Sequence, residues 1–236
     1  MTRAAEFVGI VPAAGYARRL QPLPCSKEVY PIGGRPVMDY LLERMQAAGN
    51  VHIRVVTRPD KLDVIAHAGQ RGASVITAHP PSASASIRLG LAGLAPSAIV
   101  LLGFPDTIWE PRDGFRRLLE AVEAGHAVAL GLFETRDLAR SDVVTVGPDG
   151  RITEVAVKPS QPTSPWIWGC AAARAEALEG LRNDVEIGRY FDELSRGGTD
   201  VVGLALGGPW LDIGTPEALS RALALAVADA TAREPK

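Results

Sequence analysis

Small residues followed by three cations mark the beginning of the chain. An apolar run over residues 7–11 ends in the turn Pro12-Ala13-Ala14-Gly15, and Arg18, Arg19 and Lys27 follow within the next stretch. A turn of tiny side chains lets backbone N–H groups approach an anion closely. Three cations so close together suit several phosphate groups at once. The pattern predicts a site for a nucleoside triphosphate.

Two common phosphate-binding loops are excluded at this turn. No Gly-Lys-Ser/Thr follows Gly15, so the turn is not a Walker A loop. Ala17 stands where G-x-G-x-x-G has its second glycine, so the dinucleotide fingerprint is excluded as well. For this segment alone, a plain strand–turn–helix with surface cations stays the alternative interpretation.

Two aspartates are candidate metal ligands. Asp106 follows the apolar run at residues 99–103, and open α/β sheets place their sites at the carboxyl ends of such strands. Asp212 stands in an apolar stretch, where an unpartnered carboxylate is unfavourable, so a nearby cation is expected. The alternatives are a turn-forming role for Asp106 and an N-cap role for Asp212, although Thr215 already suits that cap.

Four segments together resemble, in the same order, the motifs of the sugar-1-phosphate nucleotidylyltransferases. The last of them, Trp210-Leu211-Asp212-Ile213-Gly214-Thr215-Pro216-Glu217, matches the family's W-L-D-I-G-T-P-E almost letter for letter. The resemblance spans the chain from Gly9 to about Leu219. The other three segments are Pro12–Ile32, Leu101–Ile108 and Val157-Lys158-Pro159 with Gly169.

The resemblance implies a role for each candidate residue. Arg19, Lys27, Asp106 and Lys158 would be the catalytic residues, and Asp106 and Asp212 would hold Mg²⁺. Acceptor binding would fall to Asp142, Lys158 and Gly169; for Lys158 alone, an edge-strand residue is the alternative. The nucleotide would be bound by Ala13, Ala14, Gly15, Arg19, Lys27, His79, Ser82 and Asp106.

The implied reaction is nucleotidyl transfer. An acceptor phosphate oxygen attacks the α-phosphorus of the triphosphate, and pyrophosphate leaves. Such a displacement needs charge neutralisation and alignment rather than covalent help from the protein. Mg²⁺ held by one or two carboxylates meets that need. A non-catalytic module that still binds a nucleotide or nucleotide sugar is the alternative.

Departures from the family pattern concern the base and the sugar. His79 and Ser82 stand where relatives that use uridine or thymidine triphosphate have glutamine and glycine. The common Tyr-Gly-Val-Val is Ser141-Asp142-Val143-Val144 here, and Val157 replaces the glutamate of Glu-Lys-Pro. We therefore expect a changed base preference and poor use of glucose 1-phosphate. A non-sugar phosphate or a phosphonate is the alternative acceptor.

Composition and charge agree with an ordinary globular enzyme. The 236 residues are 47% hydrophobic and 22% charged, and the net charge of −2 offers no broad basic surface for nucleic acid. No apolar run approaches the length of a membrane span. With only two cysteines, a reduced, cytoplasmic protein is expected, and Cys25 beside the cations is a candidate reactive thiol. A homo-oligomer is left open.

Alternating strand and helix patterns predict an α/β fold, a Rossmann-like, doubly wound and mostly parallel sheet. Residues 1–230 are expected to form one catalytic domain, with a frayed tail at 231–236. A hairpin is predicted around Pro148-Asp149-Gly150. Further strands are predicted at 7–11, 53–56, 73–77, 99–102, 127–132, 166–172 and 201–206. Helices are predicted at 36–48, 115–122, 187–194 and 216–230.

Overall fold

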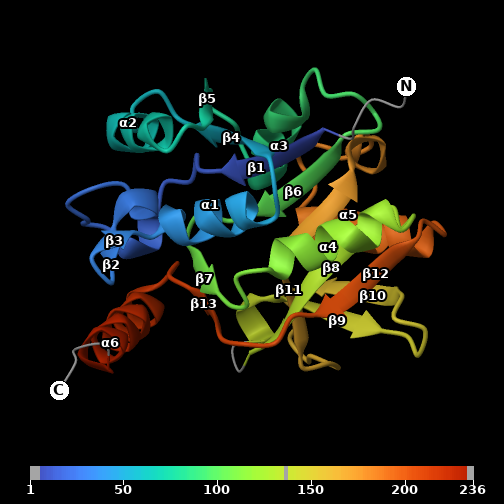
Figure 1. Ribbon diagram of the computed structural model, residues 1–236. Coiled ribbons are helices and arrows are strands. Elements are labelled where there is room, and N and C mark those ends of the chain that lie inside the picture. Colours follow the sequence, from blue (N-terminus) through green and yellow to red (C-terminus); the bar gives the residue numbers. More distant parts are fainter. Residues whose placement is uncertain (1–5, 136–137, 233–236) are drawn as a thin grey trace.

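A nine-stranded sheet forms the centre of the protein (Figure 1). The structure, a computed structural model, describes residues 6–135 and 138–232. The strand order is β10-β9-β11-β6-β1-β4-β5, and β8 pairs with β11 and with β12. The strands are β1 (Phe7–Pro12), β4 (Val51–Thr57), β5 (Ser74–Thr77), β6 (Ile99–Gly103), β8 (Val128–Glu134), β9 (Asp142–Val146), β10 (Ile152–Val157), β11 (Trp166–Arg174) and β12 (Val201–Ala205).

Most strands of this sheet run in one direction. Strand β1 is parallel to both β4 and β6, β4 is parallel to β5, and β8 is parallel to β12. Strand β11 runs antiparallel to β6, β8 and β9, and β10 runs antiparallel to β9. The predicted mostly parallel sheet is therefore confirmed, as is the hairpin at 148–150, which joins β9 to β10.

Helices cover both faces of the sheet. Buried side chains of α1 (Met38–Ala47), α2 (Leu62–Gln70) and α4 (Gly114–Glu123) pack in one apolar cluster with strand residues. Those of α3 (Ala83–Leu91) and α5 (Ile187–Arg196) belong to a second cluster, which contains the alternate residues of the same strands. The sheet is thus doubly wound, as predicted. Across the described ranges, no helix is long and apolar enough to cross a membrane.

A second, two-stranded sheet joins distant parts of the chain. Strand β7 (Thr107–Trp109) pairs antiparallel with β13 (Trp210–Asp212), which places Asp212 opposite Thr107. The last helix, α6 (Pro216–Ala232), follows β13, and its buried Ala222 packs near Ile32. The helix includes two residues of the predicted tail; residues 233–236 lie outside the described part.

The first helix begins later than the sequence predicts. Pro36 was expected in its first turn, but α1 starts at Met38, and that expectation was wrong. Pro36 belongs to β3 (Arg35–Pro36), which pairs with β2 (Pro31–Ile32). The tight turn between these strands uses Gly33 and Gly34 at φ values of 61° and 78°, which glycine adopts without steric cost.

Candidate functional site

Hydrogen bonds to neighbouring segments fix the backbone of the turn that follows β1. The N–H of Ala13 donates to the carbonyl of Val56 at 2.7 Å, so it extends the sheet and is already paired. The Ala13 carbonyl accepts from Thr57 Oγ1 at 3.1 Å and from Lys61 Nζ at 3.0 Å. The backbone open to a ligand therefore begins at Ala14.

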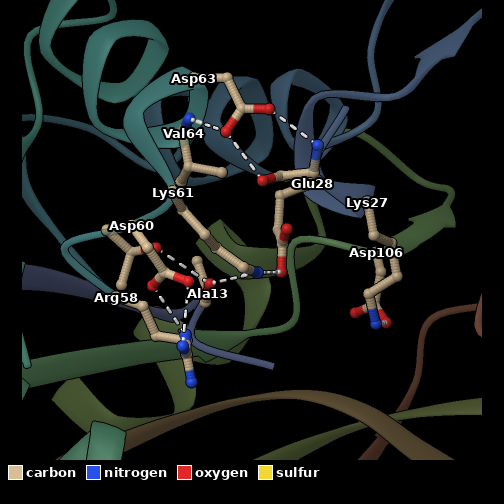
Figure 2. A network of polar contacts seen from close by, with 11 residues as sticks. Ala13, Lys27, Glu28, Arg58, Asp60, Lys61, Asp63, Val64 and Asp106 are labelled. Carbon is tan, nitrogen blue, oxygen red and sulfur yellow. Dashed lines mark hydrogen bonds and ion pairs between the residues drawn. The ribbon is translucent and has the colours of Figure 1, made fainter. Parts of the chain in front are cut away.

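A buried ion pair supports this turn. Figure 2 shows Lys61 lying between the Ala13 carbonyl and Glu28, with Nζ 2.7 Å from Glu28 Oε1. The side chains of Lys61 and Glu28 are only 11% and 2% exposed. Burial raises the pKa of Glu28, and the nearby Lys61 ammonium opposes that rise. Removal of either charge would leave the other uncompensated in the protein interior.

Cys25 lies at the edge of the same network. The carboxylate of Asp63 accepts from the N–H and the hydroxyl of Ser26, both at 2.7 Å. Burial, together with the charges of Asp63 and Glu28, raises the pKa of the Cys25 thiol. The predicted reactivity of Cys25 is therefore not favoured, because the thiolate is the reactive form.

Above the turn lies a cavity of about 220 Å³, here named the loop cavity. Its lining includes Ala14, Gly15, Lys27, Ser82 and Asp106. The structure thus brings the predicted small-residue turn, one predicted cation and one predicted acid to a single hollow.

Lys27 and Asp106 form an ion pair on the wall of the loop cavity. Lys27 Nζ lies 2.5 Å from Asp106 Oδ2, and both side chains are mostly buried. Burial opposes ionisation of Asp106, but the Lys27 ammonium outweighs it and holds the pKa of Asp106 below its usual value. Asp106 is therefore ionised at neutral pH.

The pairing of β13 with β7 places Asp212 beside Asp106. The N–H of Ile213 donates to the Asp106 carbonyl at 3.0 Å, and the N–H of Gly214 donates to Asp212 Oδ1 at 2.6 Å. Burial and the neighbouring Asp106 carboxylate raise the pKa of Asp212. Two carboxylates that repel each other in this way are a suitable donor set for a cation.

Asp106 and Asp212 both border a second hollow of about 410 Å³, here named the central cavity. Three predicted acceptor-binding residues, Asp142, Lys158 and Gly169, line it as well. The aromatic residues Phe104, Trp168 and Trp210 complete much of its wall. A Cβ atom on Gly169 would lie 2.5 Å from the Trp210 indole nitrogen, so only glycine allows this indole to pack here.

A third hollow of about 530 Å³, here named the arginine cavity, joins the central cavity at Asp212 and Lys158. Arg19 lines the arginine cavity, together with Arg140 and Arg221. Arg140 also borders the central cavity. Sequence reasoning missed Arg140 and Arg221, because neither belongs to a motif and only the fold brings them beside Arg19.

Two predicted base-binding residues are separated by the structure. Ser82 borders the loop and central cavities, where its hydroxyl caps α3 by accepting from the N–H of Ala85 at 3.0 Å. The same hydroxyl donates to the carbonyl of Asn183. His79 is exposed and lines a surface hollow with Arg88 and Asn183 that shares Pro80 and Pro81 with the loop cavity but is not lined by Asp106. The structure does not bring His79 to the cavities that hold Asp106.

Sequence comparison relates the chain to known nucleotidyltransferases. A sequence profile of the MobA-like NTP transferase domain matches residues 9–197. The glucose-1-phosphate thymidylyltransferase of Neisseria meningitidis is 26% identical over 91% of this chain and 80% of its own. The low-salt glycan biosynthesis nucleotidyltransferase of Haloferax volcanii is 23% identical over 94% of this chain and 66% of its own.

Solved structures share the fold at lower identity. A UDP-glucose pyrophosphorylase complexed with UDP-glucose superposes with a TM-score of 0.81 at 15% identity, covering 97% of this chain and 100% of that chain. The UTP-bound enzyme of the same activity from Acinetobacter baumannii gives a TM-score of 0.76 at 16% identity, covering 93% of each chain. At these identities the likeness shows the fold alone.

Proposed function

Because the chain belongs to the MobA-like NTP transferase family, whose relatives are nucleotidyltransferases, we propose that it transfers a nucleotidyl group from a nucleoside triphosphate to a small phosphorylated acceptor. Pyrophosphate is the second product. One observation carries the proposal: Asp106 borders both the loop and central cavities, and Asp212 borders both the central and arginine cavities. The reacting phosphates of two substrates meet at these two carboxylates.

We assign some of the cationic side chains to the triphosphate and others to the phosphate of the acceptor. In this assignment the triphosphate lies in the loop cavity against Lys27, and its phosphates extend past Asp106 and Asp212 to Arg19 in the arginine cavity. Lys158 and Arg140 hold the acceptor's phosphate at the border of the central and arginine cavities. An acceptor oxygen then forms a bond to the α-phosphorus while the bond from that phosphorus to the pyrophosphate oxygen breaks. Alignment and charge neutralisation supply most of the rate.

Asp106 and Asp212 are the residues that would hold Mg²⁺. The described residues contain no group of three or more His, Cys, Asp or Glu side chains that could hold a metal ion. The two carboxylates of Asp106 and Asp212 fit Mg²⁺, because this ion takes one or two protein carboxylates and completes its coordination shell with water and substrate phosphates. When bound, the ion would neutralise phosphate charge. The expected cytoplasmic location stays a prediction, and we propose residues 1–230 as the catalytic unit.

A pyrophosphate-release screen tests the proposed function. Purified protein with Mg²⁺ is given each common triphosphate with a panel of phosphorylated acceptors. We expect pyrophosphate that depends on both substrates. Tight nucleotide binding with no release for any pair would favour the non-catalytic binding module instead.

The two substrate sites should separate under mutation. Arg19→Ala should weaken triphosphate binding, because Arg19 lines the arginine cavity beside Asp212, where the triphosphate's phosphates reach it in this assignment. Lys158→Ala should raise the acceptor KM or lower kcat and leave triphosphate affinity nearly unchanged, because in this assignment Lys158 holds only the acceptor's phosphate. Calorimetric titration with triphosphate measures both. Equal losses of triphosphate affinity in the two variants would show that Lys158 is misassigned.

Substrate preference is expected to differ from that of the named relatives. His79 lies outside the cavities of the site, and the Ser82 hydroxyl is already used in capping α3. A site discriminates between bases sharply only when its polar groups are all satisfied. We expect no selective use of thymidine or uridine triphosphate with glucose 1-phosphate, as judged by kcat/KM across all pairs. Efficient turnover of that combination above all others would contradict the expectation.

A further inference from the structure

Aromatic rings form a rigid wall of the central cavity. The Trp168 ring lies 5.7 Å from that of Phe104 and 5.1 Å from that of Phe191, in the latter case edge to face at 85°. Both contacts fix the indole, which is 7% exposed. Trp210 lines the cavity from the β13 side. Aromatic faces carry negative electrostatic potential and attract cations, especially where water is excluded.

One carboxylate of this cavity accepts its hydrogen bonds from neutral groups. Asp142 Oδ2 accepts from the Trp168 indole N–H at 3.3 Å, and the backbone of Lys158 hydrogen-bonds to Asp142 as well. A Cβ atom on Gly188 would lie 2.2 Å from Asp142 Oδ2, so glycine at this position makes room for the carboxylate. The Lys158 ammonium attracts the Asp142 carboxylate through its charge but forms its ion pair with Glu186, at 3.0 and 3.1 Å from the two carboxylate oxygens.

A second carboxylate that lines the central cavity is Asp184. It lines the central cavity beside Val185 and Glu186, in the segment that leads into α5. Within the ranges that the structure describes, its side chain makes no ion pair. This segment is fixed to α3, because Ser82 and Ser84 donate to the carbonyls of Asn183 and Val185. Asp184 is therefore presented to the cavity on an anchored backbone.

Asp142 and Asp184 form no ion pair in the described part of the chain, and carboxylates of this kind beside aromatic rings suit a positively charged organic group. We propose that the part of the central cavity lined by Asp142, Asp184 and Trp168 binds an ammonium group. The acceptor is then a small aminoalkyl phosphate or phosphonate. Its phosphate would meet Lys158 and Arg140, and its ammonium would meet Asp142, Asp184 and Trp168. The inference rests on the proposed nucleotidyl transfer and names the acceptor class.

Matched acceptors test the charge directly. Choline phosphate and ethanolamine phosphate carry a quaternary and a primary ammonium, respectively. Neohexyl phosphate is the neutral counterpart of choline phosphate, because carbon replaces the charged nitrogen. With the best triphosphate, kcat/KM for at least one charged acceptor should exceed that for neohexyl phosphate by about tenfold or more. Equal use of neohexyl phosphate, or better use of glucose 1-phosphate, would overturn the proposal.

Direct binding separates this inference from the proposed reaction. Calorimetry with protein, Mg²⁺ and each acceptor requires no turnover. A charged acceptor that binds about tenfold more tightly than neohexyl phosphate supports the ammonium site even if no pair releases pyrophosphate, a result that would reject only the transfer reaction. Equal affinities would overturn the ammonium site even if transfer to another acceptor occurs. Comparing the affinities of choline phosphate and ethanolamine phosphate shows whether the cavity prefers a quaternary or a primary ammonium.

A charge-removing variant assigns the effect to the cavity. Asp184→Asn keeps the size of an exposed side chain, and we expect it to raise the KM of the charged acceptor about five- to tenfold while that of neohexyl phosphate stays unchanged. Asp113→Asn, at an exposed position beside α4, is the matched control and should change neither KM. Equal effects of Asp184→Asn on both acceptors would contradict an electrostatic role.

Discussion

Replacing Asp106 with asparagine should lower kcat for nucleotidyl transfer roughly 10²- to 10³-fold while the fold survives. The reason is that the variant loses the carboxylate at the junction of the loop and central cavities, where phosphate charge must be neutralised. Asparagine keeps the size of the side chain and still accepts from Lys27, and the carboxylates of Glu28 and Asp212 continue to compensate the Lys27 charge, so the fold is retained. Steady-state kinetics at saturating Mg²⁺ measures kcat, and thermal melts of the variant and the unmodified protein show whether the fold is retained.

Asp212→Asn should behave alike, since Asp212 borders the same cavity. Chelation with EDTA should abolish turnover, and added Mg²⁺ should restore it. The exposed Asp113→Asn serves as the control for loss of a carboxylate elsewhere. Equal turnover of Asp106→Asn and the unmodified protein would reject Asp106 as a metal ligand.

Lys61→Met should destabilise the protein by about 3–5 kcal/mol, because it leaves the buried Glu28 carboxylate without its partner. It also removes the hydrogen bond from Lys61 to the Ala13 carbonyl that fixes the turn after β1. Nucleotide affinity should therefore fall even under conditions in which the variant is folded. Urea unfolding monitored by circular dichroism gives the stability, and calorimetry gives the affinity.

A second substitution shows whether the lost charge causes the instability. Lys61→Met combined with Glu28→Leu should recover much of the stability, since a buried ion pair replaced by apolar residues is often neutral or better. Arg196→Met removes an exposed ion pair with Asp192 and should leave the unfolding midpoint nearly unchanged. A midpoint for Lys61→Met as high as that for Arg196→Met would contradict a supporting role for the buried pair.

Local patterns in the sequence predicted most of the sheet. The apolar runs that became β1 and β6 are continuous because these strands are buried on both faces. The place of Asp106 followed from its position after one such strand. Helix α2 was missed, and α1 begins two residues later than predicted, because the turn at Gly33 and Gly34 shifts its start.

Contacts between distant segments could not be predicted from local patterns. The proximity of Asp212 to Asp106 depends on the pairing of β13 with β7, two short strands far apart in the sequence. Arg140 and Arg221 carry no motif and meet Arg19 only through the fold. The pair of Lys61 and Glu28 escaped notice because nothing local marks a lysine as buried. Motif spacing also gave no sign that the backbone carries His79 away from the cavities.

The fate of the α-phosphorus tests the proposed reaction most directly. A triphosphate labelled at that phosphorus is incubated with the protein, Mg²⁺ and either choline phosphate or glucose 1-phosphate, and the products are separated. We predict that the label enters a product joined to the acceptor through a diphosphate bridge, in an amount equal to the unlabelled pyrophosphate released. Label recovered as free nucleoside monophosphate, or only as intact triphosphate with every acceptor, would contradict nucleotidyl transfer by this protein.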